Sequence, residues 1–436
     1  MRFRRSRAGG DQDAARPRQG GAMAAVSNRG SQNTGALSEL TVLDLSHHVA
    51  GAYCGKLLAA FGADVIKVEA PGEGDGARRV GPFPDGKPDP EASALYLYLN
   101  TGKKGITLDL SSDEGAGVLR ELVAHADALI ENFAPGVMES MGLDYATLSA
   151  INPRLVMASI SNFGQDGPYR DYRADTMVEM ALSGQMYVNG HPEREPLSST
   201  GYQPSYQSAL YAYSGIMAAL LARDRDGHGQ YVDISIQEAM ASEHQFTLNG
   251  FTASGSIRMR AGNRYGTVHP TTIYSCKASN GRPGLVSLGI SDPTQYVLFL
   301  ELLDMSDLLE DPRFSNPQLC ARNSVEFDAL VRPWFMDHTA EEIVHALQDN
   351  RIPAAFVNEV SDVLEDPQYE SRGFWKDVHH PVAGNHRYAS LPYHLAEAPP
   401  VYERANLLGE HTDQVLAEKL GYDGERLAGL REGGVI

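Results

Sequence analysis

The chain has 436 residues, of which 42% are hydrophobic and 43 are glycine, and its formal net charge at pH 7 is −19. This length is enough to bury a large core in more than one domain, and the acidic balance argues against a general nucleic-acid-binding protein. Three scattered cysteines without CxxC or His-rich spacing argue against a disulfide framework or a metal site and favour a cytoplasmic location. No apolar run approaches the roughly 20 residues that a membrane span needs.

The first 36 residues differ in composition from the rest of the chain. They are rich in Arg, Gly, Ser and Gln and contain no hydrophobic stretch. A secretory signal requires an apolar segment, so residues 1–36 are predicted to be a disordered tail.

From Leu40 onward, short apolar runs alternate with helical patterns. TVLDLS and DVIKVE predict strands on either side of a helix, which is a βαβ unit and implies a parallel sheet with a right-handed crossover. GITLDL, ALIENF and LVMASIS predict further strands, and the Ser111–Glu114 segment is typical of a helix N-terminus. The repeat predicts an α/β fold with a Rossmann-like, doubly wound parallel sheet.

The segment Gly72–Gly76 is the nearest match to a dinucleotide-binding GxGxxG motif. It follows a predicted strand, but Glu73 and Asp75 within it would repel a pyrophosphate. We therefore expect no NAD site.

A helix is predicted over Ala209–Leu221, followed by a glycine-rich turn and a strand over Val232–Ile236. This segment, GIMAALLAR…GHGQYVDISIQEA, resembles the corresponding part of the family III CoA-transferases, which include formyl-CoA transferase, carnitine CoA-transferase and α-methylacyl-CoA racemase. The resemblance extends in order through LTVLDLSHHVAGAYCGKLLAAFGADVIKVEAPGEGD, NTGKKGITLDL, ENFAPGVMESMGLDYATLSAINPRLVMASISNFGQDGP, RIPAAFVN and LLGEHTDQVL.

The resemblance implies an interlocked homodimer whose large domain is built from both chain ends, with a smaller α+β domain between them. On this basis residues 37–230 form the N-terminal part of the large domain and residues 231–348 a linker and small domain. Residues 349–436 then return to the large domain with C-terminal helices. The expected substrate is coenzyme A in the form of an acyl-CoA, with a carboxylic acid as the second substrate and with no metal, nucleic acid or membrane partner.

The resemblance also implies which residues bind CoA at the carboxyl ends of the first strands. The matching positions are His47, Val49, Ala50, Leu108, Asn132, Phe133, Met141 and Arg173. Ala70 and Ser140 stand where the formyl-CoA enzyme carries arginine, so the phosphates need other cations. The candidates are Lys67, Arg78, Arg79, Lys103 and Lys104, although any one of them could equally be a solvated surface residue.

The family's catalytic aspartate has no evident counterpart in this chain. No Asp or Glu occurs between Pro196 and Arg223, and the nucleophile position aligns with Ser205, or with Gln203 after a two-residue shift. Glutamine cannot form the mixed anhydride on which the family's chemistry depends, and no base that would activate the serine is visible.

Asp175 is the alternative candidate for chemistry. It aligns with a proton-transferring histidine of the racemase branch and would act as a base if burial raised its pKa. It equally suits an N-cap, because a helical run begins directly after it. Glu179, one turn further on, either shares the pocket or faces solvent.

Three functions stay open from the sequence. The chain is an autonomous CoA-transferase, a non-nucleophilic subunit of a heteromer with a homologous partner, or a repurposed enzyme. In the last case Asp175 carries out proton transfer or elimination on an acyl thioester or on a substrate without CoA.

Overall fold

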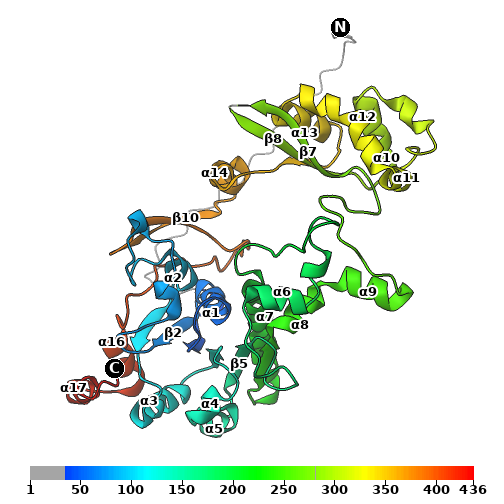
Figure 1. Cartoon of the computed structure of the whole chain (residues 1–436). Coiled ribbons are helices and arrows are strands. Elements are labelled where there is room, and N and C mark those ends of the chain that lie inside the picture. Colours follow the sequence, from blue (N-terminus) through cyan, green and yellow to red (C-terminus); the bar gives the residue numbers. More distant parts are fainter. Residues whose placement is uncertain (1–34, 280) are drawn as a thin grey trace.

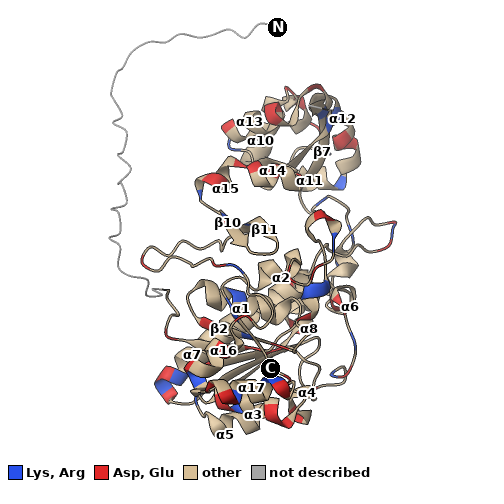
Figure 2. Cartoon of the chain, turned by 90° about the vertical axis from the view of Figure 1, so that its left-hand side faces the viewer, with Lys and Arg blue, Asp and Glu red and all other residues tan. Residues whose placement is uncertain are grey.

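A computed structural model describes residues 35–279 and 281–436, and the expected tail 1–36 lies almost entirely outside this range. The chain forms a large body around a parallel sheet and a smaller body joined to it by extended segments (Figure 1). Figure 2 shows acidic residues along helices of both bodies with basic residues between them. No helix in the described part of the chain has the length and apolar character needed to cross a membrane.

The large body contains a six-stranded sheet in which all neighbouring strands are parallel. Its order, β3-β2-β1-β4-β5-β6, is that of a doubly wound nucleotide-binding sheet, which confirms the predicted fold. The strands are β1 (Thr41–Asp44), β2 (Asp64–Glu69), β3 (Lys104–Thr107), β4 (Ala128–Glu131), β5 (Val156–Ser161) and β6 (Tyr231–Ser235).

Side chains that alternate along the strands pack into two separate apolar layers. Leu43, Ile66 and Leu129 face one layer, and their neighbours Val42 and Val65 face the other. Helices α1 (Ala50–Ala60) and α7 (Gln203–Asp226) cover the second layer, and the first is covered by α3 (Asp113–Val123), α5 (Tyr145–Ile151), α16 (Thr412–Leu420) and α17 (Gly424–Glu432).

Both ends of the described chain contribute to the large body. Val415 and Leu430 of the last two helices are buried in the same cluster as Leu43 of β1. Shorter helices at the edges of this body are α2 (Ala94–Leu99), α4 (Val137–Ser140), α6 (Thr176–Leu182) and α8 (Ile236–Glu243).

The smaller body packs helices against a three-stranded antiparallel sheet around its own core. Its elements are β7 (Thr271–Ser279), β8 (Arg282–Gly289), β9 (Ala354–Phe356), α10 (Pro293–Leu302), α11 (Pro317–Arg322), α12 (Ser324–Asp337) and α13 (Ala340–Asp349). The connections carry α9 (Gln245–Ser254), α14 (Val360–Glu365), α15 (Pro367–Ser371) and the hairpin β10 (Trp375–His380) and β11 (Gly384–Ala389).

The pairing of two strands moves the expected domain boundaries. β6 follows residue 230 but pairs with β5 in the large sheet, and β9 follows residue 348 but pairs with β8 in the small one. The large domain therefore extends through β6, and the small domain extends through β9.

Candidate functional site

The site lies where β1 and β4, adjacent in the sheet, send their chains to opposite faces. His47 follows β1 and Asn132 follows β4, and the Asn132 side chain joins them. Its Oδ1 accepts from the His47 backbone N at 2.7 Å, and its Nδ2 donates to the His47 carbonyl at 2.8 Å. Ligands of doubly wound sheets bind at this kind of position, because the diverging connections leave a crevice.

Two cavities open along this edge of the sheet and share Phe133. The first, the β2 cavity, has a volume of about 440 Å³ and lies past β1, β2 and β3. The second, the β5 cavity, has a volume of about 550 Å³ and lies past β4 and β5. The two cavities meet at Phe133, and we refer to them together as the groove.

Most of the residues expected to bind CoA line this groove. The β2 cavity is lined by His47, Leu108, Phe133 and Met141. The β5 cavity is lined by Ala50, Asn132, Phe133 and Arg173. Val49 is the first exception, because its side chain packs with Ala52 and Leu99.

His47 has an apolar partner at the mouth of the groove. Its ring meets Phe133 edge-on with the centroids 5.5 Å apart. Burial, and after it the nearby Lys67 ammonium, lowers the pKa of His47. The neutral imidazole is therefore favoured, and it offers a hydrogen bond and a flat surface rather than a charge.

Lys67 is the second exception, because it belongs to a buried ion network behind the groove. Its ammonium is fully buried, lies 2.9 Å from Asp75 Oδ2 and donates to the Ser46 carbonyl. Lys103 is equally buried and lies 2.7 Å from Asp44. Lys67 is therefore engaged within this buried network and does not line the groove, and its contact with a cofactor phosphate stays a prediction.

The same ion network holds the glycine-rich segment after β2 in place. Asp75 accepts from the backbone N of His48 at 2.9 Å and of Ala77 at 2.8 Å, and so fixes the corner of the chain. The Arg78 guanidinium is buried and binds Glu69 and Glu91.

Two of the five candidate cations remain near the surface. Lys104 pairs with Asp64 at 2.8 Å. Arg79 is exposed, donates to the Glu73 carbonyl at 2.8 Å and has no carboxylate partner among the described residues. Arg79 is thus bonded to the backbone of Glu73, which lines the β2 cavity together with Ala70.

The start of α7 carries the two residues at the nucleophile position. Gln203 is exposed and Ser205 is half-buried. Within the described part of the chain, neither side chain forms a hydrogen bond to a carboxylate or an imidazole, and the Ser205 carbonyl accepts from Ser208 Oγ at 3.0 Å. No base is therefore in place to activate the serine.

Asp175 is exposed and caps α6. Its Oδ1 accepts from the backbone N of Met177 at 3.1 Å and of Val178 at 3.2 Å. These bonds use the carboxylate to satisfy free N–H groups at the helix start. A role in proton transfer stays a prediction for this residue.

Glu179 is the buried carboxyl group on the same helix. Its side chain is 3% exposed, and burial, with a smaller effect of Asp175, raises the pKa of Glu179 to about 7. With the Asn162 amide oriented to satisfy both of its ends, Asn162 Nδ2 donates to Glu179 Oε1 at 3.2 Å. Asn162 lines the β5 cavity, so the carboxyl group lies just behind the wall of that cavity.

Two residues of the β5 cavity were not identified from the sequence. Arg170 and Asn162 both line it, and neither was singled out. The period of α6 is the only sequence signal for Glu179, since it places this residue one turn from the cap. The described residues contain no group of three or more His, Cys, Asp or Glu side chains arranged to hold a metal ion.

Comparisons with known proteins agree on one family. The sequence pattern of CoA-transferase family III matches residues 37–412. A succinyl-CoA–D-citramalate CoA-transferase from Chloroflexus aurantiacus is 32% identical over 402 residues, which is 92% of this chain and 98% of that protein. A formyl-CoA:oxalate CoA-transferase from Bradyrhizobium diazoefficiens is 31% identical over 421 residues, which is 92% of this chain and 98% of that protein.

A solved structure shares the fold over most of the chain. The crystal structure of a CAIB/BAIF family protein from Brucella suis matches with a TM-score of 0.79 at 31% sequence identity. The match covers 89% of this chain and 100% of that one.

Proposed function

The chain belongs to CoA-transferase family III, and from this premise we propose that it binds a CoA thioester along the groove formed by the β2 and β5 cavities. There it takes part in moving CoA between an acyl-CoA and a carboxylic acid. Relatives at about 30% identity are named for reactions of this type, with succinyl-CoA, formyl-CoA and small acids.

One observation carries the binding part of the proposal. The groove lies at the strand-order reversal of the sheet, and the residues expected to bind CoA converge on it from segments far apart in the sequence. Apolar side chains such as Phe133 and Met141 line it, and Arg170 and Arg173 supply cations in the β5 cavity, whereas the carboxylates Glu69, Glu73 and Asp109 lie in the β2 cavity. This arrangement suits a long ligand that carries phosphates at the β5 end.

The start of α7 limits what the chain does alone. In the family's reaction a carboxylate attacks the thioester carbonyl, the CoA thiolate leaves and a mixed anhydride forms. Gln203 cannot act in this way, and Ser205 has no base beside it. We therefore place this chain as a CoA-binding, non-nucleophilic subunit, with the carboxylate supplied by a homologous partner.

Two measurements on the full-length chain test this assignment. CoA is expected to raise the melting temperature, and incubation with acyl-CoA, acceptor acid and hydroxylamine is expected to leave the protein unmodified. If CoA gives no stabilisation, the binding role is wrong. If a carboxylate of this chain is modified, the chain is an autonomous transferase.

A gain-of-function variant sharpens the test. Ser205→Asp returns a carboxylate to the first turn of α7, and we expect it to form a hydroxylamine-sensitive adduct with acyl-CoA. Ser214→Asp, on the exposed side of the same helix, is the matched control and stays unmodified. Equal labelling of both variants would show that the reaction does not depend on the site.

The buried carboxyl group of Glu179 favours a second candidate function. A carboxyl whose pKa lies near 7 exchanges protons readily at neutral pH, and Glu179 lies directly behind the β5 cavity. In this function α6 carries out proton transfer on an acyl thioester. Deuterium exchange at the α-carbon of an acyl-CoA that stops in Glu179→Gln supports it, and exchange at an unchanged rate rejects it.

A further inference from the structure

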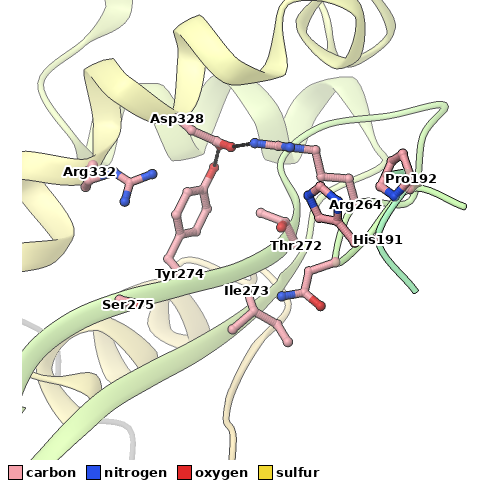
Figure 3. Close-up of a pocket in the computed structure, with 12 residues that line it drawn as sticks. His191, Pro192, Arg264, Thr272, Ile273, Tyr274, Ser275, Asp328 and Arg332 are labelled. Atoms are coloured by element: carbon pink, nitrogen blue, oxygen red, sulfur yellow. Dashed lines mark hydrogen bonds and ion pairs between the residues drawn. The ribbon is translucent and has the colours of Figure 1, made fainter. Parts of the chain in front are cut away.

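A third cavity, which we call the Arg332 cavity, lies at the edge of the small body. It has a volume of about 300 Å³ and shares no lining residue with the β2 and β5 cavities. The loop at His191, the segment Ala261–Arg264, strand β7 and helix α12 line it (Figure 3). Segments far apart in the sequence therefore converge on one small pocket.

The one acidic residue in the lining is already fully engaged. Asp328 binds Arg264, accepts from Tyr274 Oη at 2.7 Å and lies 2.7 Å from His269 Nε2. Burial opposes ionisation, but these hydrogen bonds lower the pKa of Asp328 to about 2. The carboxylate is therefore ionised, and its charge is already matched by that of Arg264.

The basic groups in the lining keep unused donors. Arg264 Nε is buried and has no hydrogen-bond partner. Arg332, one turn along α12 from Asp328, lines the cavity and has no ion pair or hydrogen bond within the described residues. Figure 3 shows its side chain extending from the helix beside Tyr274, with His191 and Arg264 at the other end.

This arrangement suits a small anion with paired oxygens. Two guanidinium groups face one carboxylate whose charge is already compensated, so the lining has an excess of positive charge. Planar guanidinium forks match the two oxygens of a carboxylate in particular.

We propose that the Arg332 cavity binds the carboxylate of a small organic acid, with the guanidinium groups of Arg332 and Arg264 as donors. That carboxylate belongs to a free acid or to the distal end of a dicarboxylic acyl-CoA. The role of this binding in CoA transfer rests on the proposed function. The binding itself does not, because it does not require CoA.

Calorimetric titration of the full-length chain with succinate tests the binding. We expect saturable binding that weakens at least tenfold in Arg332→Ala, with only a minor part restored in Arg332→Lys, because an ammonium group lacks the guanidinium fork. Arg322→Ala is the matched control, because Arg322 is exposed on α11 and lies outside the cavity. Succinate binding that Arg332→Ala leaves unchanged would overturn the proposal, as would equally strong binding of inorganic phosphate.

The source of the carboxylate is resolved by titrating CoA, acetyl-CoA and succinyl-CoA. If Arg332→Ala weakens succinyl-CoA but not acetyl-CoA, the acyl group supplies the carboxylate. If it weakens only free succinate, the acceptor acid supplies it. If none of the three CoA compounds binds while succinate does, the proposed function fails and the Arg332 cavity stands.

Discussion

At the scale of single residues, the charge partner decides what each lysine or arginine near the groove does. Lys67 and Lys103 are fully buried against Asp75 and Asp44, so their charges hold the ends of β1 to β3 in place. Removing one member of such a buried pair typically costs about 3–5 kcal/mol, because the other charge is left without compensation. Arg79 has no carboxylate partner in the described structure and is free to meet a ligand.

Arg79→Ala tests this distinction. Loss of one exposed guanidinium contact to a phosphate is expected to cost about 1 kcal/mol, which is roughly a fivefold rise in the Kd for CoA. The effect should shrink as salt is added, because the contact is exposed. Arg372→Ala, an exposed arginine at the end of α15, is the control, and an equal change in both variants would reject a specific role.

Glu179→Gln tests the perturbed carboxyl. The pKa of Glu179 in the folded chain, about 7, lies above the ordinary value of 4.5, so the folded state holds this proton more tightly. The contribution of Glu179 to the free energy of unfolding therefore falls as pH rises from about 4.5 to 7. The variant should match the wild type near pH 4 and exceed it by at most about 3 kcal/mol above pH 7.

Chemical denaturation at several pH values measures this difference. Burial also raises the pKa of Glu131 to about 7, but Glu131 is present in both proteins and cancels in the comparison. Asp171→Asn, at a highly exposed carboxylate, should follow the wild type at every pH. Parallel curves for Glu179→Gln and wild type would contradict the buried, protonated carboxyl.

At the scale of elements, α6 has only Thr176–Leu182 and depends on its cap. Asp175→Ala should lower the free energy of unfolding by about 1 kcal/mol, whereas Asp175→Asn should preserve it, since asparagine caps equally well. Denaturation and acyl-CoA proton exchange measured on the same samples separate the two roles. Asp175→Asn that is stable but loses proton exchange would make Asp175 catalytic.

The helices and strands show how much of the fold can be predicted from the sequence. The βαβ unit, the parallel strands and α7 follow from apolar periodicity and glycine turns, because these signals are local. The family resemblance is confirmed by the match over residues 37–412. Most of the residues that the same resemblance indicated for CoA binding line the groove. The observed α7 begins at Gln203, six residues before the predicted Ala209, because Pro204 suits a first turn despite the weak apolar pattern.

Contacts between segments far apart in the sequence could not be predicted from the sequence. A lysine at the end of a strand looks the same whether it faces a phosphate or a buried Asp75, and only the folded chain distinguishes the two. The meeting of Arg264 with Asp328 and the burial of Glu179 likewise depend on packing between elements. The Arg332 cavity left no sequence signal for the same reason.

At the scale of the whole molecule, helix α9 has little packing support from the rest of the described chain. None of its residues is buried, and its large apolar side chains are exposed, with Phe246 at 64%, Leu248 at 47% and Phe251 at 53%. A ten-residue helix is marginal in water without packing, and exposed apolar clusters mark interaction surfaces. We therefore expect a subunit of the same fold to cover α9. In the purified chain this subunit is a second copy, as in the interlocked homodimer that the family resemblance implies, and in the proposed heteromer it is the homologous partner.

Light scattering after gel filtration measures this assembly. The full-length chain should have about twice the 47.3 kDa of one subunit, and the double variant Phe246→Glu, Phe251→Glu should lose most of the dimer, because charges cannot be buried in an apolar contact. Ile151→Glu, an exposed apolar position at the end of α5 on the far side of the large body, should remain dimeric. A monomeric wild type would leave α9 uncovered, and a dimeric double variant would place the contact elsewhere.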